Sequence, residues 1–240
     1  MKKKACAEIG ILSTVHELPI DIRLPDLLHR IESLNQNPSV DGILIQLPLP
    51  SRFDPLQISR AINPEKDVDG FHPINAGKLL LGEEGGFIPC TPLGIQVLLE
   101  RSNIDIKGKH VVIVGRSNLV GKPLAALLVQ KKKGCNATVT IAHSQSEHLP
   151  EITRSADVLI AAIGQPGFIR LEMVKKGCVV VDVGINRVQN EAGGSKIVGD
   201  VDFSSVEPIA SRITPVPGGV GPMTIALLMQ NTYESAHRRS

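Results

Sequence analysis

Two glycines frame the turn of this chain that is best suited to hold a phosphate. Gly115 and Gly121 follow a run of four β-branched residues, 111–114, and precede an apolar stretch typical of a helix. Gly115 permits a sharp turn, and Gly121 lets helix and strand, or backbone and phosphate, come close together. A helix that begins here directs free N–H groups and its positive dipole end at a pyrophosphate. The segment Val111–Pro123 therefore predicts the start of a dinucleotide site.

The residues around this turn indicate which dinucleotide it binds. The two glycines are separated by five residues, which departs from the common G-x-G-x-x-G pattern. The glycines alone are therefore weak evidence for a dinucleotide site, and the end of the next strand strengthens it. An NAD site usually has Asp or Glu at the end of that strand, whereas this chain has His143 and Ser144 there, and Arg116 in the glycine turn. Arg116 would attract a 2′-phosphate that an acid would repel, which favours NADP. The alternative is that Arg116 is a solvated loop cation and His143 a hydrogen-bonded strand end.

Three further segments are suited to contact a ligand. Gln46 is the one polar residue of the apolar run Gly42–Pro50, so its amide either satisfies neighbouring backbone or faces a site. Asp67 and Asp69 lie in a turn-rich segment, where acids are commonly turn formers that accept hydrogen bonds from nearby N–H groups. The segment Thr214–Thr224 contains three prolines and three glycines. This mixture of rigid and permissive backbone predicts a fixed loop that presses main chain against a flat ligand.

Composition limits the classes of partner. The 240 residues are 42% hydrophobic, enough for one large core or two modest ones, and the net charge of +2 lacks the basic excess of a nucleic-acid binder. The one dense basic run, Lys131–Lys133, is expected to be a solvated helix end. No apolar run reaches the length of a membrane span, and the opening MKKKACAEIG lacks the apolar region of a signal peptide. We therefore expect a cytoplasmic protein with neither nucleic acid nor a membrane as partner.

Cysteine and histidine usage indicates neither disulfides nor a metal. The four cysteines are scattered without a C-x-x-C pair, which fits reduced thiols, and the seven histidines are equally dispersed. We expect no metal site.

From Gly108 onward, strand and helix patterns alternate, which predicts a parallel sheet covered on both faces. The strand ends carry small or turn-forming groups that would gather at one edge, where ligands of open α/β sheets bind. The expected strands are Val111–Val114, Ala137–Ala142, Val158–Ile163, Val179–Val183 and Arg212–Thr214, and the expected helices are Val120–Lys132, Ser146–Ala156, Leu171–Lys176 and Ser204–Ala210.

The part before Gly108 is of a different kind. Apolar residues spaced three and four apart predict an amphipathic helix from Leu24 to Leu34, stopped by Asn37 and Pro38, and the run Gly42–Pro50 predicts a buried strand. Near the end, Met223–Ala236 predicts an apolar helix that packs back on this first part. The first domain would then be discontinuous in sequence.

Taken in order, these segments resemble the bifunctional methylenetetrahydrofolate dehydrogenase/methenyltetrahydrofolate cyclohydrolase (FolD) family over practically the whole chain. The most specific of them are PEKDVDG and TPVPGGVGPMT together. The matching segments are ILIQLPLP, PEKDVDGFHPINAGKL, IPCTPLG, VVIVGRSNLVGKP, ATVTIAHS, IGQPG, VVVDVGIN, VGDV and TPVPGGVGPMT.

The resemblance implies an α/β protein of two domains around a cleft, usually a homodimer. It implies a Rossmann-like NADP domain at 93–221 and a smaller α/β folate-binding, catalytic domain at 1–92, truncated at its N-terminus and completed by the C-terminal helix at 222–240. It also implies the reaction of one-carbon metabolism in which 5,10-methylene-tetrahydrofolate is oxidised with NADP to the methenyl cation, which is then hydrolysed to 10-formyl-tetrahydrofolate.

The resemblance also assigns roles to residues. The catalytic lysine of the family falls on Lys2, its strand glutamine on Gln46 and its pterin-binding aspartate on Asp69. Hydration needs a base, and a lysine can act as one only when burial or a neighbouring cation, such as the methenyl cation itself, lowers its pKa. The other expected substrate contacts are Leu47, Pro48, Pro217, Gly218 and Gly219, and the expected NADP contacts are Thr91, Gly115, Arg116, Ser117, Val120, Gly121, His143, Ser144, Gly164 and Ile185.

Two departures from the family bear on these roles. Many relatives have a basic residue where this chain has Gln145, which could weaken the grip on a 2′-phosphate. The family tyrosine four places before the lysine is missing, because Met1 directly precedes Lys2. Either Met1 is an internal methionine of a longer protein, which we favour because MKKKACAEIGI looks like the middle of a helix, or this is a short form. At such a terminus, Lys2 would by itself be expected to be solvated.

Two other functions stay open at this point. A truncated, non-catalytic protein that binds folate or NADP would keep the binding residues without turnover. Another NADP-linked two-domain dehydrogenase, such as a shikimate-type enzyme, would explain the nucleotide half but leave Gln46, Asp69 and the segment Thr214–Thr224 without a task.

Overall fold

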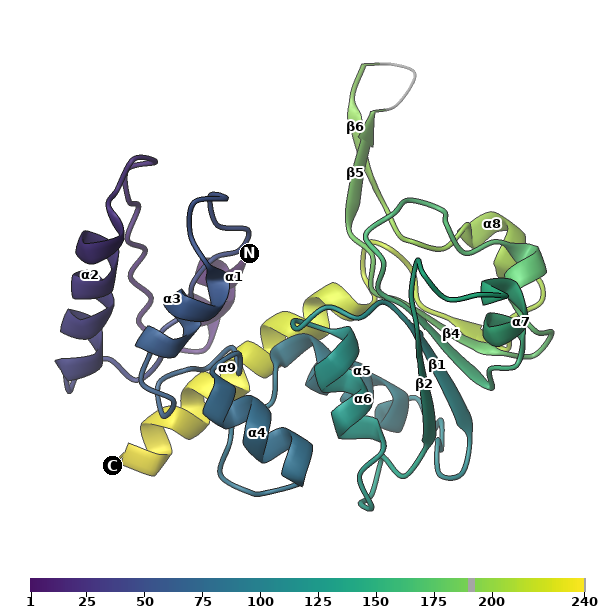
Figure 1. Cartoon of the computed structure of the whole chain (residues 1–240), viewed down its shortest axis with the longest axis horizontal. Coiled ribbons are helices and arrows are strands. Elements are labelled where there is room, and N and C mark those ends of the chain that lie inside the picture. The colour runs from purple at the N-terminus through teal and green to yellow at the C-terminus, as the bar shows by residue number, and fades with distance from the viewer. Residues whose placement is uncertain (190–192, 240) are drawn as a thin grey trace. The chain divides into compact units, whose positions relative to one another are not determined.

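A computed structural model describes residues 1–189 and 193–239 of the chain (Figure 1). The chain divides into two compact units. Unit 1 consists of Met1–Cys90 together with Ile225–Ser240, and unit 2 consists of Thr91–Thr224. One unit is therefore discontinuous in sequence, and the other is inserted into it.

Unit 2 is built on a five-stranded parallel sheet with the order β2-β1-β3-β4-β7. Apolar β-branched residues dominate β1, β3 and β4, which are buried on both faces as a central parallel strand requires. The strand order reverses between β1 and β3, which is the switch point where doubly wound sheets bind nucleotides. The α/β fold class expected from the sequence is thus confirmed. The strands are β1 His110–Val114, β2 Thr138–Ala142, β3 Val158–Ala161, β4 Val179–Asp182 and β7 Arg212–Ile213.

Helices cover the two faces of this sheet. Val112, Leu159 and Val180 point into a core on the side of α7, η1 and α8, whereas α5 and α6 lie on the other side (Figure 1). Because consecutive strand residues point to opposite faces, the intervening residues of β1, β3 and β4 supply the second core. The covering elements are α5 Cys90–Arg101, α6 Gly121–Leu128, α7 Leu149–Arg154, the 3₁₀ turn η1 Leu171–Met173 and α8 Phe203–Val206.

A separate antiparallel ribbon extends from the main sheet of unit 2 (Figure 1). Strands β5 (Asn186–Gln189) and β6 (Ser195–Val198) pair with each other in a two-stranded sheet. Within residues 1–189 and 193–239, neither strand pairs with a third, so the outer edges of the ribbon keep backbone groups available for hydrogen bonds.

Unit 1 is a cluster of helices. The apolar stripe predicted at Leu24–Leu34 forms α2, whose Leu27 and Ile31 pack with Ile58 of α3. At the carboxyl end of α2, the buried Lys66 donates from Nζ to the backbone oxygens of Leu34, Asn35 and Asn37, because the last carbonyls of a helix lack internal partners. The helices are α1 Lys2–Glu8, α2 Leu24–Gln36, α3 Pro55–Ala61, α4 Pro73–Leu81 and, from Ile225 onward, α9 Val220–Arg239.

The last helix, α9, is tied to unit 1 by buried polar side chains. Asn231 donates from Nδ2 to the carbonyl oxygens of Val68 and Ile88, at 2.9 and 3.2 Å. One turn further on, the hydroxyl of Ser235 donates to the carbonyl oxygens of Asp41 and Glu65. These bonds explain why residues far apart in sequence form one unit.

Three local predictions are wrong. The run Gly42–Pro50 is not a strand: apart from a single parallel bridge from Ile43 to Asp67, it has no strand partner among the described residues, and its prolines cannot donate to a ladder. The stretch Leu171–Lys176 forms only the η1 turn. Helix α6 ends at Leu128, so Lys131–Lys133 lie in the following turn rather than on a helix end.

Candidate functional site

In unit 1, α1 and the extended segment around Gln46 bring two expected catalytic side chains together. Lys2 Nζ donates to Gln46 Oε1 over 3.0 Å, and Gln46 Nε2 donates to the carbonyl oxygen of Leu47 over 2.8 Å. One amide atom of Gln46 thus satisfies neighbouring backbone, and the other accepts a hydrogen bond from Lys2. Lys2 is half-buried and bonded rather than simply solvated.

Asp69 lies within the electrostatic influence of this pair. Burial raises the pKa of Asp69 to about 6, and the positive charge of Lys2 opposes the rise. Burial, followed by the charge of Asp69, also raises the pKa of the Cys90 thiol, which stays protonated and donates to the carbonyl oxygen of Val68 over 3.4 Å. Near neutral pH, the site therefore combines a carboxylate, a primary amine and an amide within one unit.

The two neighbouring aspartates have different tasks. Asp67 is buried, and its Oδ2 accepts hydrogen bonds from the backbone N–H of His72 and from Asn75 Nδ2, at 2.7 and 2.8 Å. It is the turn former that the segment predicted. Asp69 makes no such turn in the described part of the chain, and it adjoins the Cys90 thiol. Its carboxylate oxygens thus keep acceptor capacity for a ligand.

In unit 2, the turn after β1 admits only glycine at two positions. Gly115 has a φ of +132°, and a Cβ there would lie 2.1 Å from the carbonyl oxygen of Ala162. A Cβ on Gly121 would lie 2.0 Å from the carbonyl oxygen of Gly115. Helix α6 begins at Gly121, directly after Val120, whose N–H donates to the Ser117 hydroxyl over 3.1 Å. The strand, tight turn and helix start that can cradle a pyrophosphate are all present.

The ends of β1 and β2 bring Arg116 and His143 together. Arg116 Nη1 lies 3.3 Å from His143 Nε2, and the N–H of Gln145 donates to His143 Nδ1 over 3.2 Å. Because Nδ1 accepts, a neutral ring carries its proton on Nε2, which then faces an arginine that can only donate. Two facing donors are suited to share an anionic oxygen, as a ribose 2′-phosphate would supply.

The remaining cofactor candidates of unit 2 lie at the same edge or on adjacent helix starts. Gly164 follows β3, and Ile185 follows β4 with 69% of its surface exposed. The Ile185 side chain is 3.9 Å from the ideal Cβ position of Gly221 in α9. One turn later in α9, the hydroxyl of Thr224 is 3.0 Å from that of Thr91 in α5. Thr91 is therefore linked to this edge through the first turns of α9.

The substrate candidates are divided between the units. Leu47 and Pro48 adjoin Gln46 in unit 1, whereas Pro217, Gly218 and Gly219 belong to unit 2. In the latter loop, Gly218 has a φ of +112°, and the N–H of Gly219 donates to the carbonyl oxygen of Pro215 over 3.0 Å. The loop is thus held in a fixed conformation by its own backbone.

Sequence reasoning missed three residues of these sites. Cys90 beside Asp69 had no signal other than its place in the segment IPCTPLG. Asp182 and Asp200 are buried carboxylates at the edge of the sheet in unit 2. A usable signal was present there, since an acid that ends an apolar run, as Asp182 ends Val179–Val181, must find hydrogen-bond donors.

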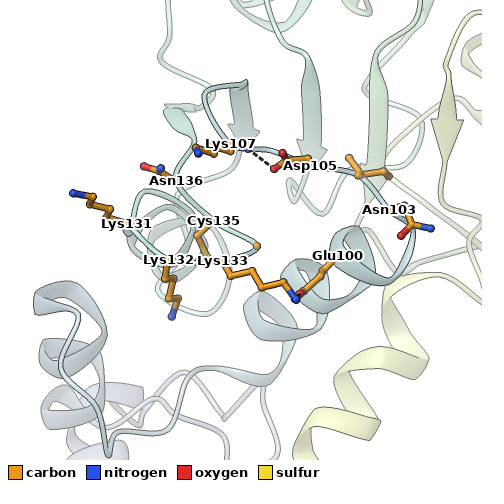
Figure 2. Close-up of a pocket in the computed structure, with 11 residues that line it drawn as sticks. Glu100, Asn103, Asp105, Lys107, Lys131, Lys132, Lys133, Cys135 and Asn136 are labelled. Atoms are coloured by element: carbon orange, nitrogen blue, oxygen red, sulfur yellow. Dashed lines mark hydrogen bonds and ion pairs between the residues drawn. The ribbon is translucent and has the colours of Figure 1, made fainter.

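A hollow of about 580 Å³ lies elsewhere on unit 2 (Figure 2). It is lined by Glu100, residues 103–105, Lys107 and residues 131–136, which precede β1 and β2, so it is at the amino ends of the strands rather than at the cofactor edge. Lys133 reaches across to Glu100, with 3.0 Å between Nζ and Oε1, while Lys131 and Lys132 point away from the hollow (Figure 2).

The described residues contain no group of three or more His, Cys, Asp or Glu side chains placed to hold a metal ion. None of the helices in this part of the chain combines the length and the apolar character needed to cross a bilayer.

Comparison with known proteins yields two family matches. Residues 1–69 match the catalytic domain of tetrahydrofolate dehydrogenase/cyclohydrolase, and residues 89–240 match its NAD(P)-binding domain. The bifunctional protein FolD of Chlamydia abortus is 55% identical over 241 aligned positions, which span 100% of this chain and 84% of that protein.

Solved structures agree with these matches. The bifunctional FolD methylenetetrahydrofolate dehydrogenase/cyclohydrolase of Campylobacter jejuni is 52% identical with a TM-score of 0.93, covering 100% of this chain and 82% of that one. The Trypanosoma brucei FolD, solved with NADP cofactor and inhibitor, is 38% identical with a TM-score of 0.92, covering 99% and 80%.

Proposed function

The chain belongs to the tetrahydrofolate dehydrogenase/cyclohydrolase family, and we propose that its two units carry the two activities through the residues described above. The enzyme oxidises 5,10-methylene-tetrahydrofolate to the 5,10-methenyl cation with NADP and hydrolyses that cation to 10-formyl-tetrahydrofolate. Folate recognition and hydration are assigned to unit 1, and NADP binding to unit 2.

The contact between Lys2 and Gln46 carries the hydration proposal. Attack of water on the methenyl carbon requires a base, and a neutral Lys2 amine can take the proton while Gln46 Oε1 receives the resulting ammonium over a 3.0 Å bond. The Gln46 amide is itself fixed through the Leu47 carbonyl, so the lysine is held in one orientation. Holding the base in place reduces the entropy lost on reaching the transition state.

Asp69 is assigned to recognition rather than to proton transfer. The pterin ring presents neighbouring N–H groups, and a carboxylate with free oxygens can accept two of them at once. The Cys90 thiol adjoins this carboxylate, and Leu47 and Pro48 are proposed to contact the ring system.

The residues of unit 2 fit NADP. The glycine turn at Gly115 and Gly121 leaves the backbone accessible to a pyrophosphate, and the facing donors of Arg116 and His143 match a 2′-phosphate. When bound, NADP supplies the nicotinamide that accepts a hydride from the methylene carbon. The protein has to position these partners, and we assign Gly164, Ile185, Thr91 and the loop at Pro217–Gly219 to that task.

We further propose that the protein is a cytoplasmic homodimer that acts on small molecules. The ribbon β5–β6 supports a dimer contact, since its outer edges can pair with a second copy. The four buried, unbridged cysteines support a reducing compartment, and a net charge of +2 does not favour nucleic acid as a partner. We propose no membrane partner.

Turnover tests the proposal directly. The chain is incubated with 5,10-methylene-tetrahydrofolate and NADP, and absorbance is followed for NADPH and then for the loss of the methenyl chromophore. Both signals are expected. Binding of folate and NADP without either signal would show a non-catalytic binding protein instead, and analytical ultracentrifugation tests the dimer.

A further inference from the structure

Two buried carboxylates organise the loops that follow β3 and β4. Asp182, at the end of β4, accepts the backbone N–H groups of Gly184, Asp200 and Val201, each over 2.9 Å. It thereby fixes the backbone that carries Asp200. Burial raises the pKa of Asp182, and the three N–H donors oppose that rise.

Asp200 in turn holds the two strand ends. Its Oδ2 accepts the N–H groups of Ile163 and Gly164 over 2.6 and 2.9 Å, and its Oδ1 accepts Nδ2 of Asn186 over 2.8 Å. Asp200 is fully buried, and in the described part of the chain its carboxylate is bonded to backbone N–H groups and an amide rather than to a lysine or arginine. Burying an acid without a cation is costly, so all of its stabilisation comes from these oriented donors.

The packing around the two acids leaves no room for a side chain at two neighbouring glycines. A Cβ on Gly184 would lie 2.3 Å from Asp200 Oδ1, and a Cβ on Gly199 would lie 1.8 Å from Asp182 Oδ2. The loop from Gly184 to Asn186 and the turn at Gly164 are therefore fixed by one carboxylate, and they contain two of the residues that we assign to NADP.

These loops serve only one half of a dinucleotide. The turn after β1 and the end of β2, with Arg116 and His143, lie on one side of the switch point, and the ends of β3 and β4 lie on the other. In doubly wound sheets, each side binds one mononucleotide half. The 2′-phosphate belongs to the adenosine half, so the loops held by Asp200 face the nicotinamide half.

We propose that Asp200 is a positioning residue for the nicotinamide half of NADP. It acts through the backbone of Gly164 and through Asn186, which fixes Ile185, and does not touch the cofactor itself. This inference rests on the proposed function, because it requires unit 2 to bind NADP.

The test compares two ligands on the whole chain by calorimetry: NADP, and 2′,5′-ADP, which contains only the adenosine half. In Asp200→Asn, the acceptor loses its negative charge, and the new amide nitrogen faces Asn186 Nδ2 unless that amide turns over, so the hydrogen bonds that fix the loops weaken. We expect NADP affinity to fall about tenfold and 2′,5′-ADP affinity to stay within about twofold of wild type. Asp202→Asn, the same change at a half-buried acid bonded to Ser204, is the matched control and should change neither affinity.

An exchange of partners distinguishes positioning from general stability. Asn186→Asp combined with Asp200→Asn restores a charged acceptor opposite an amide donor across the same 2.8 Å contact and should recover most of the NADP affinity. Should Asp200→Asn not fold, Asn186→Ala removes that contact alone. It should lower NADP affinity about threefold and leave 2′,5′-ADP affinity unchanged.

The outcomes separate the two proposals. Wild-type chain that binds neither ligand would overturn the NADP assignment itself. Wild-type binding with equal losses of both ligands in the variants, or with no loss of NADP affinity, would overturn the role of Asp200 and leave that assignment in place.

Discussion

At the scale of single residues, the hydration site depends on an amine whose direction is set by an amide. Lys2 is close to a chain end, yet Gln46 Oε1 holds its Nζ at 3.0 Å. Gln46 can do so because its other amide atom is bonded to the Leu47 backbone. A base held in this way should be needed for one of the two activities only.

Lys2→Met should separate the two reactions. Methionine keeps the length of the side chain but cannot take a proton, so hydrolysis of supplied methenyl-tetrahydrofolate should fall by about 10²–10⁴-fold, while NADPH formation keeps much of its rate. Lys3→Met, an exposed neighbour in α1, should leave both rates unchanged. Equal losses of both activities in Lys2→Met would refute the role of Lys2 as the base.

Asp69 should make folate binding depend on pH. Its pKa of about 6 means that the carboxylate is largely ionised at pH 7 and largely protonated at pH 5. Since only the ionised form offers acceptors at both oxygens, the affinity for a folate analogue should fall by up to about tenfold per pH unit below pH 6. Asp69→Asn should bind the folate analogue weakly, with an affinity that does not change with pH, as measured by calorimetry between pH 5 and 8. An unchanged pH dependence in the variant would show that another group causes it.

The Asp69 carboxyl group should also affect stability. Folate affinity should fall as pH is lowered, whereas the free energy of unfolding should fall as pH is raised. Because the pKa is raised from 3.8, the folded chain holds the proton that the unfolded chain has lost between about pH 4 and 6. The free energy of unfolding should therefore fall by up to about 3 kcal/mol as pH rises through this window, and level off above it. Denaturant unfolding of Asp69→Asn should lack this part of the pH dependence.

At the scale of elements, the turn between β1 and α6 is the most tightly determined part of the nucleotide site. Gly115→Ala forces a Cβ to within 2.1 Å of the Ala162 carbonyl oxygen at a φ that alanine rarely adopts. We expect the free energy of unfolding to fall by about 3 kcal/mol or more. NADP binding should also be lost under conditions in which the chain is still folded. Gly77→Ala in α4, where a Cβ meets nothing within 4 Å, should be neutral or slightly stabilising. A Gly115→Ala chain that binds NADP normally would show that the turn does not form the site.

The central sheet could be predicted from sequence because its strands are buried on both faces. In β1, β3 and β4, this burial requires the continuous apolar runs that the sequence displays, and the predicted strands end within two residues of the observed ones. The run Gly42–Pro50 is equally apolar but did not form a strand. Apolarity reports burial, whereas a strand also needs a neighbour to pair with, which no local pattern reveals.

The candidate site could be predicted only in part for the same reason. The glycine turn is local in sequence, so residues 111–123 indicated it directly. The contact between Lys2 and Gln46 spans 44 positions, and family resemblance rather than spacing pointed to it. The bond from Asp200 to Gly164 spans 36 positions and was missed, because each acid alone resembles an ordinary turn residue.

At the scale of the whole molecule, the chain leaves unit 1 near Cys90 and returns to it at Ile225, within α9. The polar side chains of α9 that are buried after this point, Asn231 and Ser235, bond to carbonyl oxygens of unit 1. Unit 1 therefore depends on the last residues of the chain for its stability, whereas the sheet of unit 2 is complete before them.

Asn231→Leu should therefore destabilise unit 1 without destabilising unit 2. Leucine has a similar size but leaves the Val68 and Ile88 carbonyls without their donor, at a cost of about 2–3 kcal/mol. Hydrogen exchange should become faster in α2 to α4 and stay unchanged in β1, β3 and β4, with 2′,5′-ADP affinity preserved. Gln230→Leu, at the exposed neighbouring position of α9, is the control and should change stability by less than about 0.5 kcal/mol. Equal acceleration of exchange in both units would mean that they unfold together, and that α9 transmits stability between them.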